Sequence, residues 1–211
     1  LDQAKEDALH WADALAHKIG IHKQIANRIT EPWMTMKTVI SGTEWTNFFH
    51  LRNHAVAQPE IKALAEAMTV AYTTHLPVAL KPDEWHLPYI TTATYVPTGE
   101  LQYFDENFNR LSLEDAKIIS ASCCAQVSYR KNDHTFSKAF KIWEQLIEND
   151  PVHASPIEHQ ATPMDIDSMC RFERETWQLG VTHVSANSDL WSGNLRGWIQ
   201  HRKLIENEAV W

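Results

Sequence analysis

An arginine lies within a cluster of bulky apolar residues in the first third of the chain. Arg52 follows Phe48, Phe49 and Leu51. A guanidinium group in such surroundings needs an anionic partner to offset its lost hydration. Two readings stay open from spacing alone. The partner is Glu60 or a helix C-terminus, or it is a bound phosphate or carboxylate gripped by the guanidinium fork.

A second polar cluster occupies residues 153–159. His153, Glu158 and His159 lie within seven residues, around a proline turn with apolar neighbours. Polar groups that converge beside apolar residues indicate a functional site. With His50 and His54, which are spaced i, i+4, they could instead form a metal shell. A metal-dependent hydrolase is therefore a rival reading, although the sequence has no H-E-x-x-H motif.

Three segments together resemble the flavin-dependent thymidylate synthases. Residues 47–61 carry N-F-F-x-L-R-x-x-x-x-A-Q-x-E-I, and residues 153–159 carry H-x-S-P-x-E-H, preceded by A-Q-V-S-Y at 125–129. The tail at 198–208 resembles the family hallmark W-x-R-H-R-x-x-S-x-N-E. The resemblance covers about residues 20–78 and 112–208. The presence of these motifs together is far more specific for the family than any single motif.

The resemblance implies an enzyme that methylates dUMP to dTMP. A bound FAD relays the one-carbon unit of methylenetetrahydrofolate, and NADPH reduces the flavin, so the cofactor supplies the difficult chemistry. The active site would be assembled between subunits of a homotetramer. Cys123 and Cys124 would then be structural, because this chemistry needs no nucleophilic cysteine.

The matching positions imply a set of site residues. Arg52 would contact the nucleotide and stabilise an ionised uracil ring, which makes it the catalytic candidate. Gln58 and Glu208 would help to bind the substrate, although Gln58 also suits a helix start. The implied flavin or folate residues are Asn47, Ser128, Glu158, His159, His201, Arg202 and Asn207.

The sequence departs from the family at several positions. Gln126 and Gln200 replace arginines, and Ile205 and Val210 replace serines. Losing a charge-assisted hydrogen bond costs about 1.5–3 kcal/mol. These changes favour an alternative, a relative that is non-catalytic or that modifies another pyrimidine.

The motif order is also unusual. Residues 1–80 resemble the family's C-terminal part and residues 111–211 its N-terminal part. This order predicts a circular permutation, or a phage-type variant whose upstream segment carries an intact hallmark. The start at Leu1, within a helical pattern, favours the second reading.

Composition limits the partners. The net charge is −8, which disfavours binding to polymeric nucleic acid. No apolar run approaches the length of a membrane span. Three cysteines, two of them adjacent, indicate reduced thiols. We expect a cytoplasmic protein, in the host cytoplasm if it is viral, that uses small-molecule substrates.

Periodicity predicts the elements that position these residues. Helices are expected at 2–19, with Trp11 and Ile19 inward, and at 22–29. A strand is expected at 34–41, and Thr43 should cap a helix over 44–50. A long helix should follow over 59–76, and a strand over 89–96 within an otherwise irregular stretch. Ser112 and Thr135 should cap helices reaching about Tyr129 and Glu148. The expected fold is α+β, with helices packed against a small sheet in one domain over residues 1–211.

Overall fold

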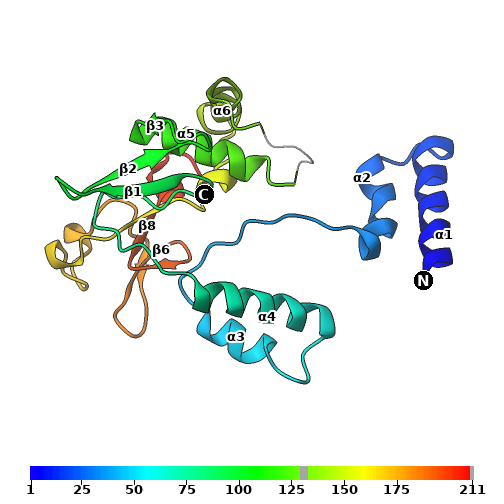
Figure 1. The fold of residues 1–211 in the computed structure, drawn as a ribbon, viewed down its shortest axis with the longest axis horizontal. Coiled ribbons are helices and arrows are strands. Elements are labelled where there is room, and N and C mark those ends of the chain that lie inside the picture. Colours follow the sequence, from blue (N-terminus) through cyan, green and yellow to red (C-terminus); the bar gives the residue numbers. More distant parts are fainter. Residues whose placement is uncertain (129–132, 210–211) are drawn as a thin grey trace. The chain divides into compact units, whose positions relative to one another are not determined.

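The computed structural model describes residues 1–128 and 133–209. The chain separates into two compact units, Leu1–Thr38 and Val39–Trp211, and each is described by itself. Within the described residues, six α-helices and three small antiparallel sheets form an α+β architecture (Figure 1). The α+β class is thus confirmed, with three small sheets in place of one. The single domain over residues 1–211 stays a prediction.

The first unit is a small helical assembly. Helix α1 (Asp2–Asp13) continues as a π-helical turn over Ala14–Lys18, and α2 (Lys23–Ala26) continues as a 3₁₀ helix over Asn27–Trp33. Both predicted helices are confirmed in outline. The inward placement of Trp11 and Ile19 is wrong, because both are largely exposed in this unit. Two short helices have no third layer to cover a complete apolar face.

An extended segment at residues 34–41 and a helical hairpin come next along the chain. Residues 34–41 lie in no strand, so that prediction is wrong: the segment finds no ladder partner in the described chain. Helix α3 spans Thr46–Arg52 and begins later than predicted. Thr43 does not cap it, because the Thr43 hydroxyl accepts a hydrogen bond from the Arg196 N–H. Helix α4 (Pro59–Thr74) confirms the long predicted helix, with proline in its first turn.

Three sheets follow. Strands β1 (Thr91–Tyr95), β2 (Glu100–Phe104) and β3 (Arg110–Leu111) form the first. Strand β1 confirms the predicted strand, whereas β2 and β3 lie in a stretch expected to be irregular. Strands β4 (Ala161–Pro163) and β8 (Trp198–Gln200) form the second sheet. Strands β5 (His183–Val184), β6 (Leu190–Ser192) and β7 (Leu195–Arg196) form the third.

Two capped helices pack beside these sheets. Helix α5 spans Leu113–Ala125, and the Ser112 hydroxyl accepts the Asp115 N–H as predicted. It ends at Ala125, short of the predicted end at Tyr129, which lies outside the described residues. Helix α6 (Phe136–Trp143) begins at the predicted Thr135 cap and extends as a π-helical turn to Glu148.

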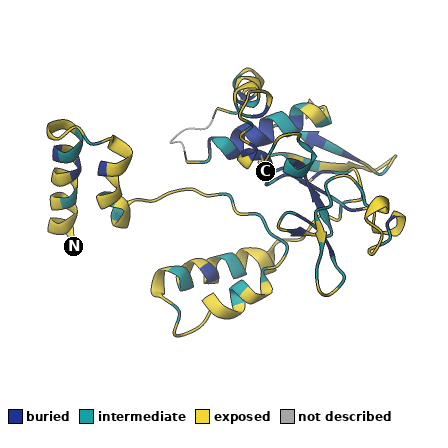
Figure 2. Ribbon diagram, turned by 180° about the vertical axis from the view of Figure 1, so that it is seen from behind, coloured by how far each residue is buried: buried dark blue, intermediate teal, exposed yellow. Residues whose placement is uncertain are grey.

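Burial is concentrated in the later part of the second unit. Figure 2 shows the buried residues gathered in α5 and the neighbouring strands, whereas α1 to α4 are mostly exposed. Helix α5 is lined by small residues, and its stretch Ile119–Cys124 is buried throughout. Small side chains allow neighbouring backbones to approach closely. In the described residues, no helix is both long and apolar enough to cross a membrane.

Candidate functional site

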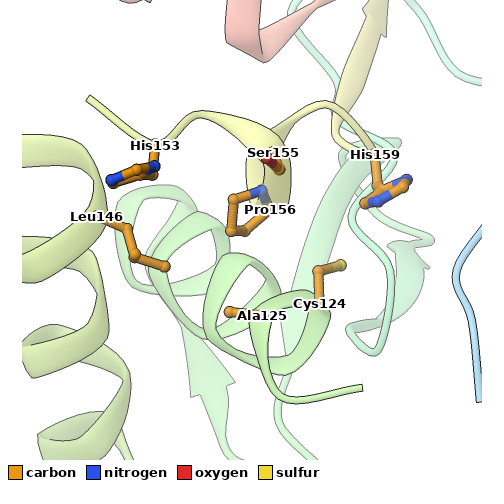
Figure 3. Close-up of a pocket in the computed structure, with 7 residues that line it drawn as sticks. All are labelled: Cys124, Ala125, Leu146, His153, Ser155, Pro156 and His159. Carbon is orange, nitrogen blue, oxygen red and sulfur yellow. The ribbon is translucent and has the colours of Figure 1, made fainter. Parts of the chain in front are cut away.

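An open pocket of about 410 Å³ lies between the end of α5 and residues 153–159. In Figure 3 the segment with His153, Ser155, Pro156 and His159 passes over the end of α5, which contributes Cys124 and Ala125, while Leu146 closes one side. The motif H-x-S-P-x-E-H and the first residue of A-Q-V-S-Y therefore line one pocket. Its volume lies at the low end of the range for small-molecule sites.

An ion-pair network connects the tail at residues 198–208 to this segment. The Arg202 guanidinium donates to Glu158 Oε2 at 2.9 Å and to Glu208 Oε2 at 2.7 Å, and Lys203 also contacts Glu208. Burial alone would raise the pKa of Glu208, but hydrogen bonds from Lys203 and Arg202 outweigh it and lower the pKa. Three of the predicted site residues, Glu158, Arg202 and Glu208, thus form one cluster. Arg202 is already neutralised by two carboxylates.

His201 is buried and does not belong to the pocket lining. Its Nδ1 lies 2.6 Å from Gln160 Oε1, and its ring lies against Trp85 with ring centroids 5.0 Å apart. Desolvation, assisted by the nearby Lys117 charge, lowers the His201 pKa to about 4. The ring is therefore neutral at physiological pH and donates Nδ1–H to the amide oxygen. Its observed contacts connect the tail to Gln160, the residue before β4, and to Trp85.

Gln200, where the resemblance would place an arginine, also forms hydrogen bonds in this region. Its Nε2 donates to the Glu158 backbone carbonyl and to Asn194 Oδ1, both at 2.9 Å. Gly193 permits this approach: a Cβ there would lie 2.4 Å from Gln200 Oε1, and its φ is +57°. A side chain at position 193 would displace the glutamine. The neutral amide fits this buried site without an anionic partner.

The other described departures are also built into the fold. Ile205 packs on the apolar cluster that contains Ile157 and Ala154. Gln126 is buried at the end of α5, where its amide donates to Ser122 Oγ and exchanges hydrogen bonds with the Asp133 backbone. An arginine at either glutamine position would bring an unpaired charge into a buried site. Val210 lies outside the described residues.

His159 is the predicted cofactor residue that lines the pocket itself. Its Nδ1 lies 3.1 Å from Ser41 Oγ, and its Nε2 lies 3.9 Å from Glu158 Oε1. Burial lowers its pKa, although the Glu158 charge acts in the opposite direction. Ser41 also accepts, through its carbonyl, a hydrogen bond from Asn194. A neutral histidine can donate to or accept from a polar ligand in the pocket.

The two adjacent cysteines have the character of structural residues. Burial raises the pKa of Cys123 to about 11 and that of Cys124 to about 12. Both thiols therefore stay protonated at neutral pH, and a protonated thiol is a poor nucleophile. Cys124 contributes an apolar wall to the pocket.

The residues predicted from the first motif stand apart from the pocket lining. Asn47 and Arg52 are exposed on α3, and Gln58 is the exposed N-cap of α4. Among the described residues, Arg52 forms no ion pair, with Glu60 or any other carboxylate. It lies in the last turn of α3, where a positive charge is favourable. The expectation that it is wedged into an apolar cluster is wrong.

Two further predicted residues are exposed in the described chain. Ser128 follows the end of α5, and Asn207 adopts a left-handed backbone conformation within the tail. Neither belongs to the set of side chains that line the pocket.

The metal-site rival gains no support. Across residues 1–128 and 133–209, no three His, Cys, Asp or Glu side chains are grouped so that they could hold one metal ion. His50 and His54 lie near the end of α3 and after it, and only His153 and His159 line the pocket.

The pocket can hydrogen-bond a flat polar ligand, but its own lining contains no arginine or lysine. A phosphate group would need a cation from elsewhere. The sequence marked His153 only as part of the polar cluster and of the possible metal shell, and it did not mark Ser155. It missed Ser41, Gln160 and Asn194, because their contacts join segments far apart in the sequence and no local pattern marks them.

Comparison with known proteins adds no relative. No family model, no curated protein and no solved structure matches this chain.

Proposed function

We propose that this chain is a flavin-dependent thymidylate synthase-like protein whose pocket holds part of the flavin. It would methylate dUMP to dTMP, with methylenetetrahydrofolate as the carbon donor and NADPH as the reductant. The fold would be a rearranged form of the family fold, with residues 1–80 and 111–211 in exchanged order.

One observation carries the proposal. Ala125 belongs to one motif that resembles the family, and His153, Ser155, Pro156 and His159 belong to another; all five line the same pocket. The hallmark-like tail is joined to that segment by the Arg202–Glu158 ion pair and by Gln200 on the Glu158 carbonyl. Parts of three motif-like segments thus lie together, over an apolar cluster that includes Ala121, Ile157 and Ile205. The high pKa of Cys123 and Cys124 agrees with chemistry that needs no thiolate nucleophile.

The exposed α3–α4 hairpin supports assembly between subunits. Its apolar side chains Leu51, Leu64 and Tyr72 are about half or more exposed, and Arg52 is unpaired among the described residues. Exposed apolar surface of this kind is typical of an interface. In the proposed homotetramer, Arg52 would supply the nucleotide-binding cation that the pocket lacks.

The first test is FAD binding followed by reduction and turnover. We expect the purified chain to retain FAD through gel filtration, to bleach it on addition of NADPH, and to form dTMP from dUMP and methylenetetrahydrofolate. A His159→Ala variant should weaken FAD binding, whereas the exposed control His75→Ala should not. A protein that binds neither FAD nor dUMP would contradict the proposal.

A second candidate is a relative that binds nucleotide without catalysis. Gln126 and Gln200 are committed to structural hydrogen bonds, and Arg202 is neutralised by Glu158 and Glu208. These positions offer no free cation to a ligand. Binding of dUMP by a colourless protein that does not take up FAD would favour this candidate over the enzyme.

A further inference from the structure

A second pocket, of about 360 Å³, lies in the same unit and shares no lining residue with the first. Its rim carries Arg171, Phe172, Arg174 and His183, and its base is Trp177 and Val184. The loop with residues 171–176 is exposed throughout and is drawn in gold in Figure 1. Nothing in the proposed synthase function uses this pocket.

The base of this pocket is fixed in place. Trp177 and Val184 pack against the buried cluster of Met164, Met169, Leu190 and Ile199. The Trp177 indole N–H donates to the Cys170 carbonyl at 3.1 Å, and Thr176 Oγ1 bonds both the N–H and the carbonyl of Cys170. These bonds close the loop on itself. The aromatic floor is therefore preformed, which reduces the ordering cost of binding a ligand.

The rim is cationic, although the chain as a whole is acidic. Arg174 lies over the Trp177 ring, 5.3 Å from guanidinium carbon to ring centroid. Neither Arg171 nor Arg174 forms an ion pair within the described residues, although Glu173 and Glu175 are close in sequence. A guanidinium stacked on an aromatic face keeps its N–H edge free for a two-pronged contact with an anion.

Two further aromatic groups complete the surroundings. Phe172 lines the pocket together with the two arginines, and its side chain is 79% exposed. The His183 ring is stacked on Trp191, with centroids 5.9 Å apart, which holds it at the rim. Flat rings bind on such platforms by stacking.

We propose that this pocket binds a phosphate monoester carried on a flat ring, in the chemical class of nucleoside monophosphates. The phosphate would be held by the guanidinium groups of Arg171 and Arg174, with His183 beside them. The ring would lie against the exposed Phe172, beside the Arg174–Trp177 pair. The volume suits a ligand of this size, at the lower end of small-molecule sites.

The test is calorimetric titration of the full chain with GMP, which is neither the proposed substrate nor a part of the proposed cofactor. Guanosine lacks the phosphate and inorganic phosphate lacks the ring. We expect GMP to bind at least tenfold more tightly than either. Equal affinity for GMP and inorganic phosphate, or no binding of GMP at millimolar concentration, would overturn the proposal.

Variants locate the site. Arg171→Gln combined with Arg174→Gln should weaken GMP binding about tenfold or more, because two charged hydrogen-bond donors are lost. Phe172→Ala should have a smaller effect, and it should weaken GMP without weakening inorganic phosphate. Arg110→Gln, an exposed arginine paired with Glu100 on another sheet, is the matched control. Unchanged affinity in the double variant would refute the site, whereas failure of FAD binding would leave it intact.

Discussion

The α3–α4 hairpin and the segment from α5 to the tail carry equally suggestive sequence motifs, but they differ in structure. Glu158, His201, Arg202 and Glu208 are tied to one another or to the core, by hydrogen bonds between residues up to 44 positions apart. Asn47, Arg52 and Gln58 lie exposed on a hairpin with one buried side chain, Ala65. A motif in the later region is built into the fold. The same kind of motif on the hairpin is left available for a ligand or a partner.

The largest expected effect concerns packing in the two regions. Ile157 is fully buried beneath the pocket segment, so Ile157→Ala should lower the free energy of unfolding by about 2–5 kcal/mol. Leu64→Ala on α4 should change it by less than about 0.5 kcal/mol, because that side chain is half exposed. Urea denaturation measures both. A large loss of unfolding free energy in Leu64→Ala would mean that a partner covers the hairpin. The two regions would then differ in what buries them, the chain itself or another subunit.

The pH dependence of stability should come from the later region. The His201 pKa is 6.5 when unfolded and about 4 when folded, so the unfolded state binds more protons between these values. The corresponding stability is present above pH 6.5 and is lost as the pH falls towards 4, by about 3 kcal/mol in total. Denaturation of the wild type and His201→Asn at several pH values tests this. We expect the variant to lose most of the pH dependence in that window; an unchanged profile would contradict the buried neutral ring.

The next effect distinguishes two arginines. Arg202→Gln leaves Glu158 and Glu208 without their shared partner and should cost about 1–2 kcal/mol, less than for a fully buried pair because the side chain is 32% exposed. Arg196→Gln, whose exposed guanidinium pairs with Glu44 and Asp189, is the matched control and should cost less than about 1 kcal/mol. Equal losses of unfolding free energy in the two variants would show that the Arg202 ion pairs stabilise the fold no more than an exposed ion pair does.

The smallest expected effect on stability is at Arg52. Because Arg52 is exposed and unpaired among the described residues, Arg52→Gln should leave the free energy of unfolding within about 0.5 kcal/mol of the wild type. The same variant should weaken dUMP binding about tenfold or more, through loss of a charged contact to the phosphate. Thermal denaturation and dUMP titration are measured in parallel. If Arg52→Gln lowered the free energy of unfolding and left the affinity for dUMP unchanged, Arg52 would be a structural residue and not a nucleotide-binding one.

Local signals predicted the helices better than the contacts. The Ser112 and Thr135 caps and the proline at the start of α4 are short-range chemistry, and all three begin helices where predicted. The strand expected at 34–41 has suitable residues but no partner, because pairing depends on segments elsewhere in the chain. Thr43 resembles a cap, but a long-range bond to Arg196 takes its hydroxyl.

The candidate site follows the same division. The sequence located the pocket segment, because histidines, serine, proline and glutamate are close together in 153–159. It did not predict that Gln200 and Gln126 would be structural amides, since only the folded chain brings Glu158, Asn194 and Asp133 to them. These two glutamines resembled losses at a ligand site, but they are also consistent with a fold that uses neutral, hydrogen-bonded side chains at these positions.

We propose above that the pocket between α5 and residues 153–159 holds part of the flavin. The most direct measurement is FAD binding, followed by its visible spectrum, for the wild type and for Ser155→Trp. Ser155 is exposed at the pocket, so a tryptophan there would block it without entering the core. We expect that the wild type binds FAD and that Ser155→Trp does not, with both proteins equally folded by circular dichroism. Equal FAD binding by the two proteins, or none by the wild type, would contradict it.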